Sequence, residues 1–264
     1  MARTRLIGYG FVLLLLLVSM AGIVLDRLFP PPSLTGGASF TQVVLAKDGT
    51  LLRAFPDSQH IWRYPVTLQD VSPRYLEALL RYEDRFFYRH PGVNPVALLR
   101  AASQWLFSGR IVSGGSTLTM QVARLLEPQP RTLSGKLRQI LRALQLELRS
   151  SKNDILTYYI NHAPMGGVLE GLEAASRSYY GKPAIRLSHA EAVLLAVLPQ
   201  SPSRLRPDRY PERAQTARNK VLERMAGTWP AEILREARQE PVYALTLSSP
   251  QLAPLLAEHL RRRE

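Results

Sequence analysis

The chain has 264 residues, of which 46% are hydrophobic, 21% are charged and none is cysteine. This composition can supply a buried core and excludes a disordered chain, while the missing cysteines exclude disulfides and thiolate metal sites. The formal net charge of +13, from 34 lysines and arginines against 21 acidic residues, predicts an anionic partner such as nucleic acid, a membrane surface or a phosphorylated substrate.

Three segments precede the first predicted strand. A basic tail at residues 1–5 is followed by an apolar run at residues 6–25 that contains no charged side chain. Because about 20 residues at a helical rise of about 1.5 Å cross the roughly 30 Å core of a bilayer, this run predicts a single transmembrane anchor. A cleaved signal peptide is the alternative interpretation. Residues 26–40 are rich in proline and glycine and predict a linker.

The membrane signal bears on the choice of anionic partner. No recognisable nucleic-acid motif occurs, and the arginines are spread through the predicted helices instead of forming one basic arm. We therefore expect no nucleic-acid partner. The basic residues before the apolar run predict that the N-terminus stays in the cytoplasm.

The remaining elements are predicted from periodicity and capping residues. Val43–Leu45 and Leu51–Phe55 flank an Asp-Gly turn, which indicates a β-hairpin. From Ser72, expected as the N-cap before Pro73, the pattern is helical. Further helices are expected at Pro95–Trp105, about Gly135–Arg149, Ser188–Leu198, Pro211–Met225 and Pro230–Arg238. The predicted fold class is mainly α with a small β-hairpin near its start.

Two of these helices have informative patterns. The helix from about Gly135 is strongly amphipathic, and its apolar face is formed by Leu137, Ile140, Leu141, Leu144 and Leu148. The helix after Ser188 begins with a capping box, because Glu191 follows three residues later. Its remainder is apolar on all sides, which predicts a helix buried at the centre of a domain.

Glu83 lies on the apolar stripe of the helix that begins at Pro73, with leucines three, four and seven residues before it. An apolar setting disfavours the ionised carboxylate and raises its pKa toward the range of a general base near neutral pH. The alternative is a structural glutamate that pairs with Arg81 or Arg85.

A glycine-rich stretch, Gly114 to Gln121, follows at a distance. Its two glycines precede short hydrogen-bonding side chains at Ser116, Thr117 and Thr119. Such a composition suits a loop that lines a polar ligand site, although by itself it is also typical of an ordinary turn.

Together the two stretches resemble the first two signature motifs of the peptidoglycan glycosyltransferases, glycosyltransferase family 51. Residues 83–92 are similar to E-D-x-x-F-x-x-H-x-G, and residues 114–121 to G-x-S-T-x-x-Q-Q. Two more stretches follow in the expected order: residues 152–161 resemble K-x-x-I-L-x-x-Y-L-N, and residues 218–222 resemble R-R-x-x-V-L. The resemblance covers roughly residues 40 to 260.

The resemblance implies a lysozyme-like glycosyltransferase domain at residues 41–228, held outside the cytoplasmic membrane by the anchor. Residues 229–264 would then be a C-terminal tail or the start of a second domain. Family members polymerise lipid II: the 4-hydroxyl of the acceptor GlcNAc attacks C1 of the MurNAc on the growing chain, with inversion, and undecaprenyl diphosphate leaves. The implied partners are lipid II, the growing glycan chain and the membrane.

The resemblance also implies residue roles. Glu83 would be the catalytic base, because the reaction needs a proton acceptor for the attacking hydroxyl. Cations are needed for the diphosphate, aided by a divalent metal, Mg²⁺ or Mn²⁺, bound through the substrate. Asp84 and His90 are expected to hold the loop of the first motif. The expected substrate-binding residues are Ser116, Thr117, Gln121, Arg124, Arg131, Lys136 and Gln139.

Two features depart from the family pattern. Gln139 stands where the family's third motif, R-K-x-x-E, has a second glutamate, and Met120 replaces the first glutamine of the usual pair. Glu147, eight residues further along the helix, is about 12 Å away and too distant to substitute. No serine is followed three positions later by lysine, so the nucleophile motif of the bifunctional members' transpeptidase is missing. Either the chain works as a glycosyltransferase alone, with a separate transpeptidase as an expected partner, or it is a fragment of a longer protein.

These departures keep two other functions open. A catalytically weak membrane scaffold for cell-wall assembly would fit Gln139 and the missing transpeptidase motif. A lysozyme-like hydrolase rests on fold analogy alone and would want a second carboxylate near the first.

Overall fold

A computed structural model describes residues 40–47, 51–108, 115–245 and 253–261, with short stretches and single positions before residue 40. The described part is mainly helical, which confirms the predicted fold class. Its α-helices after residue 70 are α2 (Pro73–Glu83), α3 (Pro95–Ser108), α4 (Leu118–Leu126), α5 (Leu133–Arg149), α6 (Lys152–His162), α7 (Leu172–Tyr180), α8 (His189–Val197), α9 (Pro211–Arg224), α10 (Ala231–Gln239) and α11 (Pro254–Arg261).

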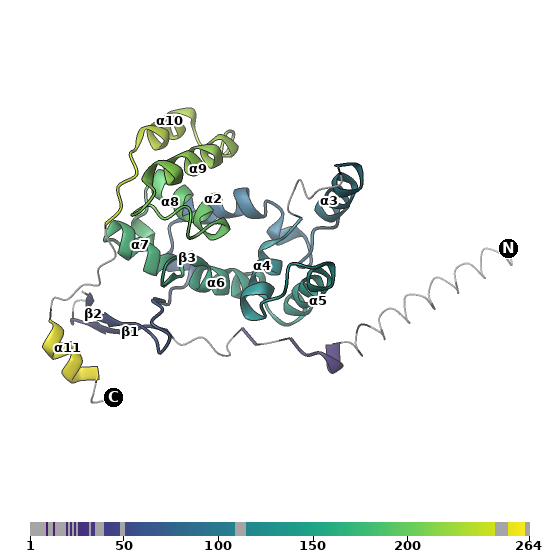
Figure 1. Ribbon diagram of the computed structural model, residues 1–264, viewed down its shortest axis with the longest axis horizontal. Coiled ribbons are helices and arrows are strands. Elements are labelled where there is room, and N and C mark those ends of the chain that lie inside the picture. Colours follow the sequence, from purple (N-terminus) through teal and green to yellow (C-terminus); the bar gives the residue numbers. More distant parts are fainter. Residues whose placement is uncertain are drawn as a thin grey trace.

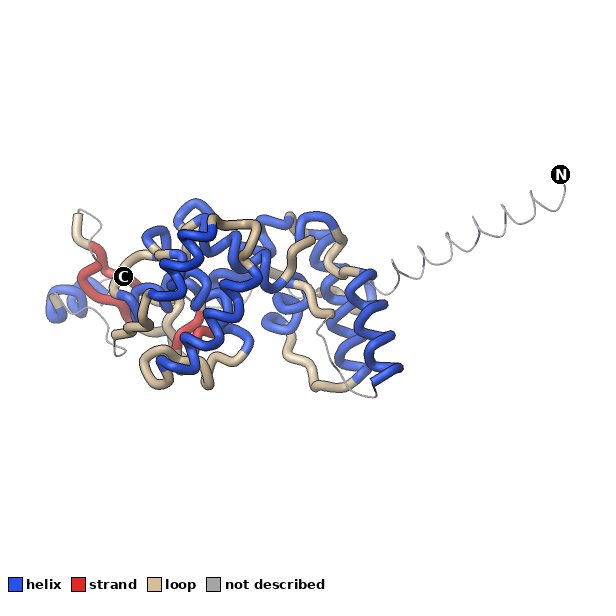
Figure 2. The backbone as a smooth tube through the Cα atoms, turned by 90° about the horizontal axis from the view of Figure 1, so that it is seen from above, coloured by secondary structure: helices blue, strands red, loops and turns tan. Residues whose placement is uncertain are grey.

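The helices form two groups (Figure 1). Helices α2, α7, α8, α9 and α10 gather on one side, α3, α4 and α5 lie on the other, and α6 runs between them. Helix α2 packs on α8, which packs on α9, while α4 packs on both α5 and α6. The view from above shows the same division (Figure 2). The residues that carry the two main motifs therefore lie where the groups meet.

Helix α8 is the centre of the first group. The predicted capping box is present: the Ser188 hydroxyl accepts from the Glu191 backbone N–H, and the Glu191 carboxylate accepts from the Ser188 N–H. Residues 192–198 are all buried, as expected for a helix that is apolar on every side. A short 3-10 helix, η4 (Leu198–Gln200), follows directly and brings Gln200 to the edge of this group.

Two small antiparallel hairpins complete the described fold. Strands β1 (Gln42–Leu45) and β2 (Leu51–Phe55) confirm the first, whose Asp-Gly turn lies outside the described residues; helix α11 packs on this hairpin. Strands β3 (Pro164–Gly166) and β4 (Leu169–Glu170) form a second hairpin that sequence patterns did not predict. Strands of two or three residues are too short to show a period of two.

Helix α5 buries a different face from the one its leucines suggest. Leu137 is 59% exposed and Leu148 is 82% exposed, whereas Arg142 and Gln145 are buried. These polar side chains are satisfied by the chain before the first hairpin, because both donate to the backbone oxygen of Phe29, at 2.6 and 2.9 Å. The buried face of α5 thus combines these hydrogen-bonded polar side chains with Ala143 and Leu146, while Leu137 and Leu148 are left at the surface.

Two further predictions concern the Ser72 N-cap and the transmembrane run at residues 6–25. Helix α2 begins at Pro73 as predicted, but the buried Ser72 hydroxyl makes no hydrogen bond with a described residue, so its side chain does not cap the helix. The predicted transmembrane run at residues 6–25 lies almost entirely outside the described residues. Among the residues that are described, no helix is both long and apolar enough to cross a bilayer.

Candidate active site around Glu83

Glu83 is the last residue of α2, and its carboxylate is held by two amides. Gln121 Nε2, on α4, donates to Oε2 at 2.7 Å, and Gln200 Nε2, in η4, donates to Oε1 at 2.9 Å. The two donors come from segments 38 and 117 positions away, so they reach Glu83 only because the two helix groups meet here. Gln121 was predicted in the site, whereas no sequence pattern pointed to Gln200.

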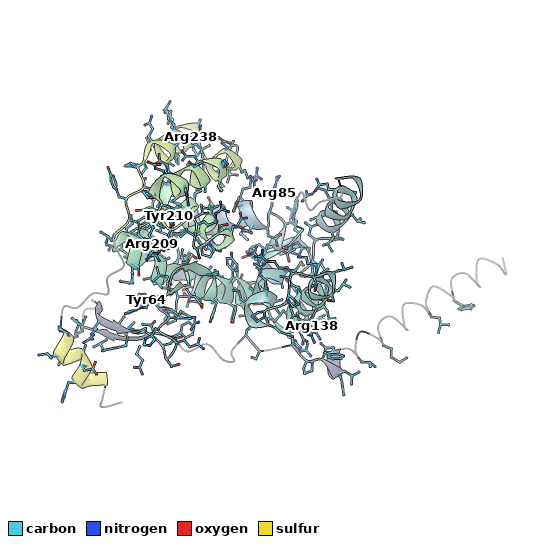
Figure 3. The ribbon with its side chains drawn as sticks, viewed as in Figure 1. Tyr64, Arg85, Arg138, Arg209, Tyr210 and Arg238 are labelled. Carbon is cyan, nitrogen blue, oxygen red and sulfur yellow. The ribbon has the colours of Figure 1, made fainter. Side chains whose placement is uncertain are left out.

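The surroundings of Glu83 raise its pKa above the usual glutamate value. Burial is the main cause, and the adjacent Asp84 adds to it, while the two amides and the charge of Arg124 act in the opposite direction. The alternative partners are engaged elsewhere: Arg81 Nε donates to the Arg224 backbone oxygen at 3.2 Å, and the Arg85 guanidinium lies over the Phe86 ring. Figure 3 shows Arg85 between the two helix groups. The local surroundings of Glu83 therefore match those of a base more than those of a structural ion pair.

Asp84 and His90 hold the loop of the first motif, as expected. The buried Asp84 carboxylate lies 2.9 Å from His90 Nε2 and accepts from the Leu118 backbone N–H at 3.0 Å, at the start of α4. Thr117 caps α4 by accepting from the Met120 N–H, and its own hydroxyl donates to the Gly92 backbone oxygen. Thr117 is only 2% exposed, so its hydroxyl serves the fold in this structure.

A second set of polar side chains surrounds Lys136 on α5. Its ammonium donates to Ser116 Oγ at 2.6 Å and to Gln139 Oε1 at 3.1 Å. Gln139 is buried, and its amide donates at 2.6 Å to the Met120 backbone oxygen. Burial lowers the pKa of Lys136, and the charge of Arg124 lowers it further. Lys136 and Gln139, both expected among the substrate-binding residues, are therefore in direct contact.

Arg124 links the two sets electrostatically. It is exposed on α4, and its charge acts on the pKa of both Glu83 and Lys136. Arg131 is exposed in the loop between α4 and α5, and it forms no hydrogen bond or ion pair with any residue that the structure describes. Among the residues that the structure describes, no contact therefore links Arg131 to the other predicted site residues.

The site can accept a proton and attract an anion. Glu83 supplies a carboxylate with a raised pKa, and the positive charge of Arg124 acts both on Glu83 and on the Lys136 ammonium. Within the described residues, no group of three or more histidine, cysteine or acidic side chains could hold a metal. Ser116 and Gln139 offer only neutral oxygens, and both already face the Lys136 ammonium, so the residues around Lys136 do not fit a resident divalent ion.

Comparison with known proteins assigns the family. The Transglycosylase family model matches residues 48–226, and the chain therefore belongs to the transglycosylase family. It is 60% identical over 234 residues to penicillin-binding protein 1C of Escherichia coli, a match that covers 88% of this chain and 30% of that protein.

Other relatives are also penicillin-binding proteins. Penicillin-binding protein 1A of Pseudomonas aeruginosa is 40% identical over 83% of this chain and 27% of its own length. Penicillin-binding protein 1B of Vibrio cholerae is 42% identical over 60% of this chain and 21% of its own. The chain thus matches 30% or less of the length of each of these relatives.

Proposed function

We propose that this chain is a peptidoglycan glycosyltransferase that polymerises lipid II by inverting transfer and releases undecaprenyl diphosphate. The observation that carries the proposal is Glu83: a partly buried carboxylate with a raised pKa, fixed by Gln121 and Gln200 and close to the charge of Arg124. Membership of the transglycosylase family supports the reaction class.

Glu83 acts as the general base in this mechanism. The acceptor's 4-hydroxyl passes its proton to the carboxylate while its oxygen forms the bond to C1 of the donor MurNAc. Each Glu83 oxygen accepts one amide hydrogen bond, and a carboxylate oxygen can accept about two, so each keeps capacity for the substrate proton. The amides orient the carboxylate without neutralising its charge.

The cations stabilise the leaving group. As the bond from C1 to the diphosphate breaks, negative charge grows on the phosphate oxygens, and positive side chains preorganised nearby lower the barrier. The candidates are Arg124, whose charge acts on Glu83, and Lys136, on whose ammonium the Arg124 charge also acts. Arg131 joins them on the basis of the family motif. Ser116 and Gln139 position the Lys136 ammonium by accepting its hydrogen bonds.

We further propose that a Mg²⁺ or Mn²⁺ requirement, as in the family, is met by an ion bound to the substrate diphosphate. The neutral oxygens around Lys136 support this arrangement, because such an ion depends on phosphate oxygens for its negative ligands.

The proposed location is the cytoplasmic (inner) membrane, with one span at residues 6–25 and the catalytic domain on the outer side. The exposed leucines of α5 support a membrane-facing position for this helix. So do the contacts of residues just after the span, because Asp26 pairs with Arg149 on α5. A separate transpeptidase is the proposed partner for cross-linking the product.

The test is incubation of detergent-solubilised protein with labelled lipid II and Mg²⁺ or Mn²⁺. We expect glycan chains from the wild type and none at a comparable rate from Glu83→Gln. Unchanged lipid II would favour a catalytically weak scaffold for cell-wall assembly, and cleavage of preformed glycan would favour a hydrolase. Either result would overturn the proposed transfer reaction.

A further inference from the structure

Gln200 is the less constrained of the two glutamines that hold Glu83. Its side chain is exposed, and it lies in the short 3-10 helix η4. Gln121, by contrast, is half-buried on α4. A long, exposed glutamine side chain rotates freely, and holding it in one orientation costs conformational entropy. Gln200 can therefore orient the Glu83 carboxylate only if another contact fixes its amide.

Tyr82 makes that contact. Its hydroxyl donates to Gln200 Oε1 at 2.6 Å, while Nε2 of the same amide donates to Glu83 Oε1 at 2.9 Å. Among the described residues, these are the only hydrogen bonds of the Gln200 side chain. Tyr82 and Glu83 are consecutive residues at the end of α2, so one helix holds the amide of Gln200 at both of its polar atoms.

The Tyr82 hydroxyl favours one of the two orientations of the Gln200 amide. An ionised carboxylate can only accept hydrogen bonds, so it requires Nε2 on its side. Rotation of the amide would place Oε1 against the Glu83 oxygen and would leave the phenol proton without its acceptor. The hydroxyl therefore supports the orientation that suits an ionised Glu83, and a base must be ionised before it can accept a proton.

Tyr82 is itself held in place. The guanidinium of Arg224, the last residue of α9, lies 5.1 Å from the centre of the Tyr82 ring. Arg81 Nε donates to the Arg224 backbone oxygen at 3.2 Å, which ties the end of α9 to α2. Burial and the charge of Glu83 raise the pKa of Tyr82 above the usual tyrosine value. The hydroxyl therefore keeps its proton, and remains a donor, at the pH values where a carboxylate titrates.

The other ionisable groups that act on Glu83 lie on α2, α4 and α6. Asp84 raises the pKa of Glu83, and Arg124 lowers it. Burial and the charge of Glu83 raise the pKa values of Tyr75 and Tyr159, so both of these phenols stay neutral. Within the described part of the chain, none of the four forms a side-chain hydrogen bond with Gln200. A change confined to the Tyr82 hydroxyl leaves all four in place.

Resting on the proposed function, we infer that Tyr82 is a positioning residue for the base: its hydroxyl holds the Gln200 amide with Nε2 toward Glu83 and so fixes the direction of the carboxylate. Gln121 has a weaker counterpart, because the Tyr159 hydroxyl lies 3.4 Å from its Oε1. Tyr82 is therefore the tyrosine whose hydroxyl matters more for the orientation of Glu83.

The experiment is a double-mutant cycle with Tyr82→Phe, Gln200→Ala and the two substitutions combined. Tyr82→Phe removes the hydroxyl and keeps the ring on which Arg224 stacks. The matched control is Tyr210→Phe, because the Tyr210 ring also lies under a guanidinium, that of Arg213 at 4.8 Å, and its hydroxyl forms no hydrogen bond with a described residue. Figure 3 shows Tyr210 on the side of α7, α8 and α9.

Two quantities are measured for each protein. The first is the pH dependence of kcat and kcat/KM with labelled lipid II. The second is the pH dependence of Glu83 modification by a water-soluble carbodiimide, which reacts with the protonated carboxyl, followed by mass spectrometry of the modified peptide. The second measurement reports the titration of Glu83 without requiring turnover. Thermal unfolding shows that each variant is folded.

We expect Tyr82→Phe to lower kcat about three- to tenfold, as for one lost hydrogen bond, with KM changed less than about twofold. The Gln200 hydrogen bond lowers the pKa of Glu83, so loosening that amide should raise the pKa. The acidic limb of kcat/KM and the carbodiimide titration should both move to higher pH.

Gln200→Ala should move both curves in the same direction by at least as much, and adding Tyr82→Phe to it should cause no further change. The control, Tyr210→Phe, should match the wild type in both measurements.

A Tyr82→Phe effect of the same size in the Gln200→Ala background would overturn the inference, because the hydroxyl would then act without the amide. So would a folded Tyr82→Phe variant with unchanged kcat and an unmoved Glu83 titration. If the wild type does not polymerise lipid II, the proposed function fails, and the carbodiimide titration still decides whether Tyr82 acts on Glu83 through Gln200.

Discussion

Glu83 and Glu147 both accept hydrogen bonds from side chains of helix α4, yet their other partners differ. Glu83 accepts from Gln121 and from a second neutral amide. Glu147 accepts from Thr119 and from the Lys152 ammonium at 2.7 Å, and Lys152 also donates to the His90 backbone oxygen. The first carboxylate is fixed without a compensating charge in contact, and the second is neutralised by a fixed cation.

The comparison shows how one residue type acquires two roles within one site. A carboxylate that is ion-paired with an ammonium from another segment ties the two segments together. Glu147 does this for the loop of the first motif: Gly92, at φ +80°, lies so close that a Cβ there would meet Glu147 Cγ at 2.7 Å. Glu83 is a partly buried carboxylate whose hydrogen bonds come from neutral amides, and its raised pKa gives it the affinity for a proton that a base requires.

The largest expected effect follows from removing the proton acceptor. Glu83→Gln preserves shape, and rotation of one neighbouring amide restores the hydrogen bonds, so stability should change little. Lipid II polymerisation should fall by at least about 100-fold, as is typical of losing a general base. The measurement is initial rate with labelled lipid II, alongside thermal unfolding. Near-wild-type turnover would remove Glu83 from the mechanism.

Glu147→Gln should show the opposite pattern. Losing the charge-assisted bond from Lys152 should lower the free energy of unfolding by about 2 kcal/mol. Turnover at a temperature where the variant stays folded should fall by less than about tenfold, because the carboxylate touches structural groups only. Denaturant unfolding and the lipid II assay measure the two quantities. A 100-fold loss of turnover at unchanged stability would place Glu147 in the chemistry.

The third prediction is that Gln121→Ala changes the pH dependence of activity, because Gln121 hydrogen-bonds to the Glu83 carboxylate. The Gln121 hydrogen bond lowers the pKa of Glu83, so its loss raises that pKa further above the ordinary glutamate value. A base works only when deprotonated, and activity is lost as the pH falls through its pKa. The acidic limb of kcat/KM should therefore move to higher pH than in the wild type.

The matched control for this pH shift is Gln59→Ala, which makes the same substitution at an exposed position. Its acidic limb should coincide with that of the wild type. An unmoved limb in Gln121→Ala, with activity reduced by the same factor at every pH, would mean that Gln121 acts only through substrate binding.

The smallest expected effect concerns Gln139. A carboxylate at this position can still accept from Lys136 but cannot donate to the Met120 backbone oxygen, so Gln139→Glu should cost about 1 kcal/mol of stability. Polymerisation should be retained with a stronger response to added Mg²⁺ or Mn²⁺, because negative charge is now available beside the diphosphate. Metal titrations of wild type and variant compare the two.

Gln139→Met provides the control, since it keeps the volume and removes both polar contacts. It should show no gain in metal response. If wild type, Gln139→Glu and Gln139→Met are alike in turnover, donor affinity and metal response, Gln139 only supports the helix.

Sequence patterns predicted the elements whose signals are local. The capping box at Ser188, the prolines that open α3 and α9, and the Asp-Gly turn each act within a few residues, so they were read without knowledge of the rest of the chain. The position of Glu83 beside apolar leucines was also local, and so was the placement of Lys136 three residues before Gln139 on one helix.

Sequence patterns missed the features that depend on contacts between segments far apart in the chain. Gln200 follows an apolar helix without any motif, and only the packing of α2 on α8 brings it to Glu83. The amphipathic pattern of α5 gave no sign that Arg142 and Gln145 are buried, because their partner, the Phe29 backbone oxygen, lies more than 100 positions away.

Short-range spacing of residues was enough to predict the mainly helical class and the family, which are confirmed, and to propose Glu83 as the base. Tertiary structure alone decided which partners the charged groups have. It gave Glu83 two neutral amides and gave Glu147 a lysine. The physical reason is that the pKa and role of an ionisable group depend on neighbours within a few ångströms, and here many of those neighbours lie far away along the chain.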